Sequence, residues 1–256
     1  MDCAERQKEI ERVLLAERRS GVEGLARRFR VSEVTIRKDL AQMEARGLLL
    51  RTHGGAVLAE RPEQVVPHLA RSRENLAGKQ RIAREAARRV QDGEHVLLDA
   101  GSTALELARA LSGRSVNVVT NSLPAAMELA GEGGEEAAVL VLGGVLRRSS
   151  FALMGPVTVA QAEGFHCERA FLGASGFDLR TGFSCQNLIE AETKRAMAGT
   201  AREVVVLADH TKFQRTAFAP ICPLGELDAV ITDQAPPREA EQALRKAGVE
   251  IVVAVE

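Results

Sequence analysis

Short polar and cationic side chains gather within about two helical turns in a pattern suited to reading DNA. Ser32, Glu33, Thr35, Arg37 and Lys38 can donate or accept hydrogen bonds, and two of them are positively charged. Arginine and lysine recognise guanine edges and phosphate oxygens, and hydroxyl side chains reach phosphates and bases alike. These residues therefore indicate contact with double-stranded DNA.

A second set of polar and charged residues follows apolar runs in the C-terminal two thirds of the chain. Glycines let the backbone approach an anion, hydroxyls donate hydrogen bonds, and a helix that begins there adds its positive end. Carboxylates and cations complete the set, which suits a phosphorylated sugar or polyol. The candidate ligand-binding residues are Asp99, Gly101, Ser102, Thr103, Thr120, Asn121, Gly143, Gly144, Arg147, Gly173, Glu190, Lys194, Asp209 and Lys212.

Each part of this second set also has a structural interpretation. The run from Gly101 to Thr103 consists of residues that commonly begin helices, and Gly143-Gly144 is compatible with a plain turn. Glu190 and Lys194 are four residues apart, as in a surface ion pair on one helix, and Asp209 can satisfy backbone groups at a strand end. Because all are expected at one edge of one sheet, together they favour a binding site.

The DNA-reading set requires a helix with an apolar back, and the sequence supplies one after Ser32. The Ser32 hydroxyl is placed to accept the N–H of Thr35 as a helix N-cap. Ile36, Leu40 and Met43 fall at i, i+4 and i+7, which leaves the polar side chains on the other side. A recognition helix of this kind enters the major groove with its N-terminal end.

Two further helices complete a small N-terminal domain. Apolar periodicity predicts one over residues 5–16, with Ile10, Val13 and Leu14 inward, and a short one over residues 25–29.

A winged hairpin is predicted to follow the recognition helix. Gly47 is expected to end that helix. Residues 48–51 are predicted to form a strand and residues 53–55 a tight turn. Arg51 and His53 are expected to contact the DNA backbone or the minor groove.

Apolar strands alternate with helical segments after Gly93. Strands are predicted over residues 95–99, 116–120, 138–142, 169–172, 204–209, 229–232 and 251–255. Helices are predicted over residues 103–111, 124–130, 190–201 and 237–247. Continuous apolar strands separated by helices indicate a mostly parallel sheet covered on both faces. Such sheets bind ligands outside the carboxyl ends of their strands.

The charge distribution separates two regions. Residues 1–92 carry 20 Lys and Arg against 14 Asp and Glu, whereas residues 93–256 carry 14 against 21. A basic front part and an acidic remainder are typical of a DNA-binding head on a separate sensing body. Residues 59–75 lack periodicity and contain two prolines, which indicates a linker. Residues 79–90 are predicted to form an arginine-rich helix whose charged face either meets DNA or anionic partners or is simply solvated.

The sequence indicates no metal site, no disulfide bond and no membrane-spanning segment. The four cysteines are scattered, which favours buried or incidental thiols in a reducing cytoplasm, and the five histidines show no ligand spacing. There is no signal-peptide pattern at the start and no apolar run of about eighteen residues. We therefore expect a cytoplasmic protein without metal or cofactor.

One ordered series of residues runs through the N-terminal domain. It comprises Arg6 and Ile10, Leu25-Ala26, Val31-Ser32, Thr35-Ile36-Arg37-Lys38-Asp39-Leu40, Gly47, Arg51 and His53-Gly54-Gly55-Ala56. The series resembles the N-terminal signature of the DeoR family of bacterial transcriptional regulators. The resemblance implies a winged helix-turn-helix that binds an operator.

A second ordered series runs through the C-terminal part. Its segments are LLDAGSTALELARAL, VVTNSL, VLGGVLRR, RAFLGASGFD, NLIEAETKRAM and VLADHTKF. They resemble the sensor domain of the same family, so the similarity extends from about residue 5 to the end of the chain. The resemblance implies a fold similar to ribose-5-phosphate isomerase and an effector that is a phosphorylated sugar or a related metabolite. The candidate ligand-binding residues are the positions that match the pocket of this family.

We therefore predict an N-terminal all-α winged helix-turn-helix domain over residues 1–58, a linker over residues 59–75, and an α/β domain with a mostly parallel sheet over residues 76–256. The resemblance implies a homo-oligomeric repressor (dimer or tetramer) of a sugar or carbohydrate operon, controlled by a phosphorylated sugar.

Two alternatives stay open. One is a sugar-phosphate isomerase or deaminase fused to a DNA-binding head, in which Glu190, Glu192, Lys194 and Asp209 would transfer protons. The other is a constitutive DNA-binding protein whose C-terminal half only oligomerises.

Overall fold

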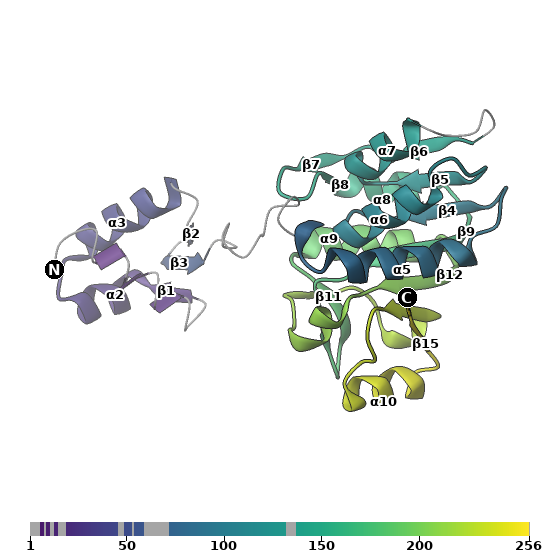
Figure 1. Cartoon of the computed structure of the whole chain (residues 1–256). Coiled ribbons are helices and arrows are strands. Elements are labelled where there is room, and N and C mark those ends of the chain that lie inside the picture. Colours follow the sequence, from purple (N-terminus) through teal and green to yellow (C-terminus); the bar gives the residue numbers. More distant parts are fainter. Residues whose placement is uncertain are drawn as a thin grey trace. The chain divides into compact units, whose positions relative to one another are not determined.

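The computed structural model describes residues 6–7, 9–10, 13–14, 19–45, 49–52, 54–58, 72–131 and 137–255. The chain divides into two compact units, Met1–Val66 and Pro67–Glu256, whose elements are labelled in Figure 1. Among the described residues, the N-terminal unit has one cluster of buried apolar side chains and the C-terminal unit has two. None of the helices in these described ranges is long and apolar enough to cross a membrane.

The helices of the N-terminal unit follow the predicted periodicity. Helix α2 spans Val22–Phe29 and helix α3 spans Glu33–Ala45. Ile36, Leu40 and Met43 are buried in one cluster with Ile10, Val13 and Leu14 of the first helical residues. The Ser32 hydroxyl oxygen accepts the Thr35 N–H at 3.2 Å, so the predicted N-cap of α3 is confirmed.

A buried ion pair joins the first helical residues to α3. Arg6 Nε lies 2.5 Å from a carboxylate oxygen of Asp39, and both side chains are almost fully buried. Asp39 lies on the inner side of α3 beside Leu40, so its charge is compensated by Arg6 rather than by solvent. The pair fixes the recognition helix against the rest of the unit.

Three strands accompany these helices, so the description of the domain as all-α was incomplete. Strands β1 (Arg19–Gly21), β2 (Leu49–Thr52) and β3 (Gly55–Leu58) form an antiparallel sheet in the order β1-β3-β2. Strand β1 was not predicted, and Gly55 begins β3 instead of lying in the turn. A Cβ on Gly55 would lie 2.2 Å from the Ser20 carbonyl oxygen, so only glycine fits where β1 and β3 meet. Gly47 and His53 lie outside the described residues.

The C-terminal unit contains the predicted parallel sheet. Seven strands pair in the order β15-β14-β12-β9-β4-β5-β6, and every pairing is parallel. They are β4 (His95–Leu98), β5 (Asn117–Thr120), β6 (Val139–Val141), β9 (Cys167–Gly173), β12 (Ala201–Leu207), β14 (Ala229–Thr232) and β15 (Glu250–Val253). All seven correspond to predicted strands.

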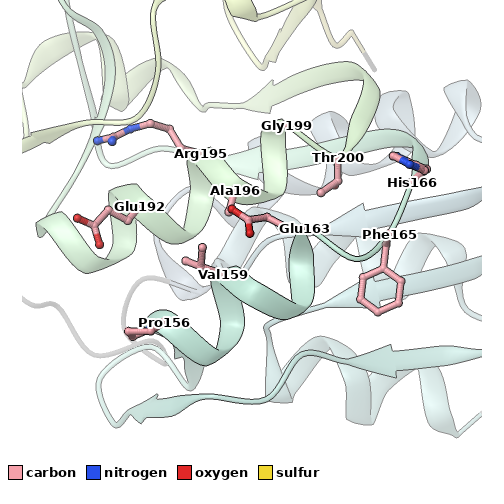
Figure 2. A pocket seen from close by; sticks show the side chains of 10 residues that line it. All are labelled: Pro156, Val159, Glu163, Phe165, His166, Glu192, Arg195, Ala196, Gly199 and Thr200. Carbon is pink, nitrogen blue, oxygen red and sulfur yellow. The ribbon is translucent and has the colours of Figure 1, made fainter.

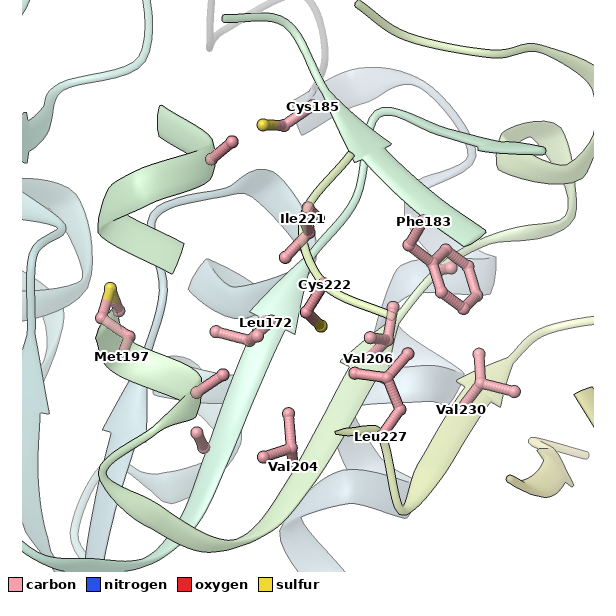
Figure 3. Packing of buried hydrophobic residues seen from close by; sticks show 14 of the residues in the cluster. Leu172, Phe183, Cys185, Met197, Val204, Val206, Ile221, Cys222, Leu227 and Val230 are labelled. Atoms are coloured by element: carbon pink, nitrogen blue, oxygen red, sulfur yellow. The ribbon is translucent and has the colours of Figure 1, made fainter. Parts of the chain in front are cut away.

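Helices cover both faces of this sheet. They are α5 (Leu76–Arg89), α6 (Ser102–Leu111), α7 (Leu123–Ala130), α8 (Pro156–Ala162), α9 (Leu188–Ala198) and α10 (Arg238–Lys246). One buried cluster joins the sheet to α5, α6 and α7, and the other joins it to α8, α9 and α10. Figure 3 shows the second cluster, where Met197 of α9 lies beside Leu172 of β9. Helix α9 ends at Ala198, before the predicted residue 201, because Ala201 begins β12.

Several short elements connect the strands and helices of this sheet, and none was predicted. Strands β7 (Val145–Arg147) and β8 (Ala152–Met154) form a hairpin after β6. Strands β10 (Gly176–Asp178), β11 (Gly182–Cys185) and β13 (Ala219–Pro220) form a small antiparallel sheet. Two 3-10 helices, η2 (His210–Gln214) and η3 (Leu224–Glu226), follow β12 and precede β14.

The arginines of α5 pair largely within the unit. Arg89 contacts Glu203 at 2.8 Å and Glu250 at 2.6 Å, which ties α5 to β12 and β15. Arg81 lies 3.9 Å from Asp233 at the end of β14. These arginines therefore contact residues of the sheet, whereas the sequence had suggested DNA, anionic partners or solvent as their neighbours.

Candidate functional site

The N-terminal end of α3 presents the predicted DNA-reading residues to solvent. Ser32, Glu33, Arg37 and Lys38 are exposed, and Thr35 is half-buried with its hydroxyl 2.9 Å from that of Ser32. An arginine and a lysine thus stand on the first two turns of a helix whose back is buried. This is the arrangement that a recognition helix requires.

Arg37 is held by an ion pair within the helix. Its guanidinium lies 2.5 Å from the Glu33 carboxylate, four residues earlier, and both side chains remain about half exposed. Pairs of this kind are worth only a few tenths of a kcal/mol, so the guanidinium is free to exchange Glu33 for another acceptor. The Lys38 ammonium has no ion-pair partner among the described residues.

The predicted wing contacts are only partly described. The backbone of Arg51 lies in β2, which pairs with β3, and His53 lies outside the described residues. The Gly54 carbonyl accepts the Val22 N–H at 2.9 Å. The hairpin is therefore anchored to the start of α2.

The loop between β4 and α6 leaves the first turn of a helix open. Gly101 occupies the N-cap of α6, and no side chain caps the helix. The first backbone bond runs from the Leu105 N–H to the Gly101 carbonyl at 2.9 Å. Within the described ranges, the N–H groups of residues 102–104 and the hydroxyls of Ser102 and Thr103 meet no acceptor. Free amides at the positive end of a helix are suited to an anion.

Four charged side chains form a continuous chain beside this loop. The Lys194 ammonium contacts the Asp99 carboxylate, and both side chains are almost fully buried. Lys194 also lies 3.8 Å from Glu190, which in turn accepts a hydrogen bond from Arg147 at 2.8 Å. The Gly173 N–H donates to Asp99 at 2.9 Å. The structure therefore brings together five of the predicted ligand-binding residues.

Burial raises the pKa of Asp99 above its ordinary value, although Lys194 and the Gly173 N–H act to lower it. Burial alone would lower the pKa of Lys194, but the neighbouring carboxylates of Asp99 and Glu190 raise it above its ordinary value. The sequence interpretation of Glu190 and Lys194 as a surface pair is thus wrong for Lys194, whose main partner is Asp99. A buried cation of this kind positions Asp99 and the start of α6 rather than facing solvent.

Thr120 and Asn121 support the neighbouring strand end. The Thr120 hydroxyl donates to the Leu98 carbonyl at 2.7 Å, and it accepts the N–H of Ser122 at 3.0 Å. The Asn121 amide donates to the Leu153 carbonyl at 3.1 Å, which ties β8 to this loop. The Asn121 carbonyl oxygen is buried without a partner in the described structure. Thr120 is therefore structural, whereas Asn121 retains an unused acceptor.

The two glycines after β6 pack closely against α8. The Gly143 N–H donates to Gln161 at 2.6 Å, and the Gly143 carbonyl accepts the Thr158 hydroxyl at 2.6 Å. Gly144 has a φ of +143°, and a Cβ there would lie 2.1 Å from the Thr158 hydroxyl oxygen. Gly144 is therefore required by the packing against α8, a partner that the sequence did not indicate, whereas a Cβ on Gly143 would lie 3.4 Å from the Gln161 side chain, an ordinary contact.

Asp209 and Lys212 form a second charged pair after β12. Lys212 Nζ lies 3.2 Å from Asp209, whose other oxygen accepts the Thr211 N–H at 3.0 Å. Burial raises the pKa of Asp209, but Lys212 and Thr211 bring it below its ordinary value. Burial, together with nearby Arg215, lowers the pKa of Lys212.

Two cavities within the described residues lie elsewhere. One measures about 640 Å³ and lies between α8 and α9, and Figure 2 shows Val159 of α8 and Glu163, directly after α8, facing Ala196 of α9. A second cavity of about 360 Å³ lies between η2, β10 and the start of α10. None of the predicted ligand-binding residues lines either one. The candidate ligand site is therefore the polar edge formed by Asp99–Thr103, Arg147 and Glu190.

The described cysteines lie in the interior of the C-terminal unit. Cys167, Cys185 and Cys222 are free and buried, and burial raises their pKa values to about 11, 12 and 11. No group of His, Cys, Asp and Glu within the described ranges is arranged to hold a metal ion.

We expect all three thiols to resist iodoacetamide at pH 8 in the native protein and to react after unfolding, because the thiolate is the reactive form. Peptide mass analysis that finds any of them alkylated in the native protein would contradict this.

Two family models match the chain. The model described as the DeoR-like helix-turn-helix domain matches residues 6–62, and the model described as the DeoR C terminal sensor domain matches residues 74–234. Together they include the recognition helix and every residue of the candidate ligand site.

Curated relatives match over most of their length. The chain is 34% identical to the HTH-type transcriptional regulator GolR of Listeria innocua, over 98% of each chain. It is 34% identical to the glycerol-3-phosphate regulon repressor of Escherichia coli K12, over 87% of each chain. It is 32% identical to the transcriptional repressor GlcR of Bacillus subtilis, over 88% of this chain and 86% of that one.

Among solved structures, the chain has distant likenesses. Ribose 5-phosphate isomerase A of Methanocaldococcus jannaschii aligns with a TM-score of 0.40 and 23% identity, over 55% of each chain. A likeness of this size carries no activity with it.

Proposed function

We propose, since the chain belongs to the DeoR family of transcriptional regulators, that it represses a sugar or carbohydrate operon under the control of a phosphorylated sugar. Relatives that align over nearly the whole chain are named as repressors, one of them of the glycerol-3-phosphate regulon. These relatives are regulators and not enzymes, so the isomerase or deaminase alternative is set aside. A regulator of chromosomal DNA would act in the cytoplasm.

The DNA-binding half of the proposal rests on the first turns of α3. Arg37 and Lys38 would contact base edges or phosphates in the major groove, Thr35 would assist, and Ser32 would cap the helix. Glu33 would orient the Arg37 guanidinium through their 2.5 Å contact. Arg51 and His53 of the wing would contact the backbone or the minor groove.

The sensing half rests on one observation, the open N-terminus of α6 beside a chain of four charges. The free amides and hydroxyls of Ser102 and Thr103 would hold the phosphate. Arg147 is the outermost of the four linked charged side chains. It would release Glu190 and offer its positive charge to the ligand instead. Lys194 would fix Asp99, whose remaining acceptor capacity would serve the hydroxyls of the sugar.

Asp209 and Lys212 would complete the polar rim at the end of β12, as would Asn121 at the end of β5. Thr120, Gly143, Gly144 and Gly173 would contribute through the backbone conformation of the strand ends. Pairing of two copies would present two recognition helices to successive major grooves, as helix-turn-helix proteins require, so we propose a homo-oligomer.

Arg37→Ala is expected to weaken binding to the operator by about 1–3 kcal/mol if Arg37 makes a bidentate contact to a base. Competition between operator and shuffled DNA, followed by fluorescence anisotropy at fixed salt, measures the loss of preference. An equal loss on both DNAs would mean that Arg37 contacts phosphate only.

The matched control is Arg27→Ala on α2. Arg27 forms the same kind of i, i+4 pair, with Glu23 at 3.2 Å, and is more exposed than Arg37. Both variants remove one positive charge and one intrahelical pair. Arg27→Ala should therefore lower affinity for both DNAs alike and leave the operator preference unchanged.

A further inference from the structure

Asp233, directly after β14, is a buried carboxylate outside the proposed effector site. Its side chain is fully buried, and it accepts hydrogen bonds from the His210 N–H at 2.7 Å and from His210 Nδ1 at 3.0 Å. It also accepts one from the Asn75 side-chain amide at 2.8 Å. Burial alone would raise the pKa of Asp233, but these donors bring it below its ordinary value, so Asp233 is ionised at neutral pH.

One end of this hydrogen-bonded cluster is the start of α5. Asn75 occupies the N-cap with φ 46° and ψ 44°, a left-handed conformation that asparagine tolerates better than most residues. Its side chain does not cap the helix and bonds to Asp233 instead. A Cβ on Gly78 would lie 2.4 Å from an Asp233 oxygen. This explains a glycine inside a helix, where glycine is otherwise unfavourable.

The turn before α5 is held from a second side. Lys79 is almost fully buried, and its ammonium donates to the Glu74 carbonyl at 2.5 Å. Residues 72–75, which the sequence assigned to the linker, thus belong to the C-terminal unit, to which Glu74 and Asn75 are bonded. They are the first described residues after the boundary at Val66, where the chain arrives from the N-terminal unit.

The other end of the cluster is the loop that carries Asp209 and Lys212. His210 begins η2 between these two residues, and the Lys212 N–H donates to the Asp209 carbonyl at 2.9 Å. Asp233 therefore bonds on one side to a loop of the proposed effector site. On the other side it bonds to Asn75, the N-cap of α5.

We propose that Asp233 is a positioning residue that couples the effector site to the segment leading from the DNA-binding unit. This inference rests on the proposed effector control. A ligand that binds Asp209 and Lys212 would shift His210, which lies between them. His210 donates two hydrogen bonds to the Asp233 carboxylate, and Asn75 donates another to the same carboxylate. Such a shift changes operator affinity only if the ligand binds the two arrangements unequally.

The first test uses the full-length Asn75→Gly variant, which removes the amide and still permits the left-handed backbone. Operator Kd is measured with and without glycerol 3-phosphate, glucose 6-phosphate, fructose 6-phosphate and ribose 5-phosphate, and Kd for each compound is measured directly. For a compound that acts on the unsubstituted protein, we compare operator Kd with the compound to operator Kd without it. We expect this ratio to be at least about fivefold smaller in Asn75→Gly than in the unsubstituted protein. Binding of the compound should persist. An unchanged ratio would overturn the proposal.

The second test needs no effector. Hydrogen exchange is measured in the unliganded Asn75→Gly and Gly78→Ala variants, with Gln80→Ala on the exposed side of α5 as the control. We expect the amides of Thr211 and Lys212 to exchange at least about tenfold faster in the first two variants only, because local opening sets exchange. Changes confined to residues 72–80 would overturn the connection.

The two tests separate this inference from the function on which it rests. If no compound alters operator Kd of the unsubstituted protein, effector control fails, and the coupling role of Asp233 fails with it. The exchange measurement still decides whether Asp233 joins the two segments. If a compound acts equally on the unsubstituted protein and on Asn75→Gly, the proposed function stands and the coupling role does not.

Discussion

Lys194→Met is expected to lower the free energy of unfolding of the C-terminal unit by about 3–5 kcal/mol, as removal of one partner of a buried ion pair does. Methionine keeps most of the side-chain volume, so the change isolates the charge. It leaves the Asp99 carboxylate buried with the Gly173 N–H as its remaining hydrogen-bond donor. Urea unfolding followed by far-UV circular dichroism measures the loss.

Two variants make this result interpretable. Lys246→Met removes an exposed lysine from the end of α10, and it should alter stability by no more than about 0.5 kcal/mol. The double variant Asp99→Asn with Lys194→Met removes both charges and keeps an acceptor for the Gly173 N–H. It should be more stable than Lys194→Met alone. A cost below about 1 kcal/mol for Lys194→Met would show that the pair is not buried as described.

Ser102→Glu is expected to abolish the effect of phosphorylated sugars on operator binding. The substitution places a carboxylate at the open N-terminus of α6, where the phosphate is proposed to bind, and two anions cannot share those amides. An acidic residue on the first turn of a helix is favourable, so the fold should be retained. Operator Kd with and without each sugar phosphate, measured by fluorescence anisotropy, gives the result.

Charge and size are separated by two controls. Ser102→Gln introduces a side chain of similar size without charge, and it should keep part of the response. Ser115→Glu adds the same charge at an exposed position beyond the other end of α6, and it should keep all of it. An undiminished response in Ser102→Glu would move the phosphate site away from α6.

The elements that could be predicted are those whose own sequence carries a strong period. The apolar runs of β4, β12 and β14 and the stripe of α3 are buried as expected. The strands that were missed are two to four residues long, such as β1 and β13. Such short strands form because a neighbouring strand offers hydrogen bonds, so their own sequences carry little signal. The same holds for Gly55, whose role depends on Ser20 in another strand.

In the candidate site, too, features with a local sequence signal could be predicted and tertiary contacts could not. The run Asp99–Thr103 could be located because a glycine and two hydroxyls follow an apolar strand directly. The partner of Lys194 could not, because Asp99 lies 95 positions earlier and meets it only when α9 packs on the sheet. The contact between Asn75 and Asp233 spans 158 positions and has no local signal. The packing of Gly143 against Gln161 is likewise a tertiary contact.

The most direct test of the central claim is the affinity of the protein for DNA upstream of its own gene, with and without phosphorylated sugars. Fluorescence anisotropy at fixed salt compares that DNA with a shuffled sequence, because phosphate contacts make all affinities salt-dependent. Unphosphorylated sugars and inorganic phosphate are the controls. We predict that at least one phosphorylated sugar changes operator Kd about fivefold or more. Tight, specific binding that no compound alters would contradict effector control and favour constitutive DNA binding.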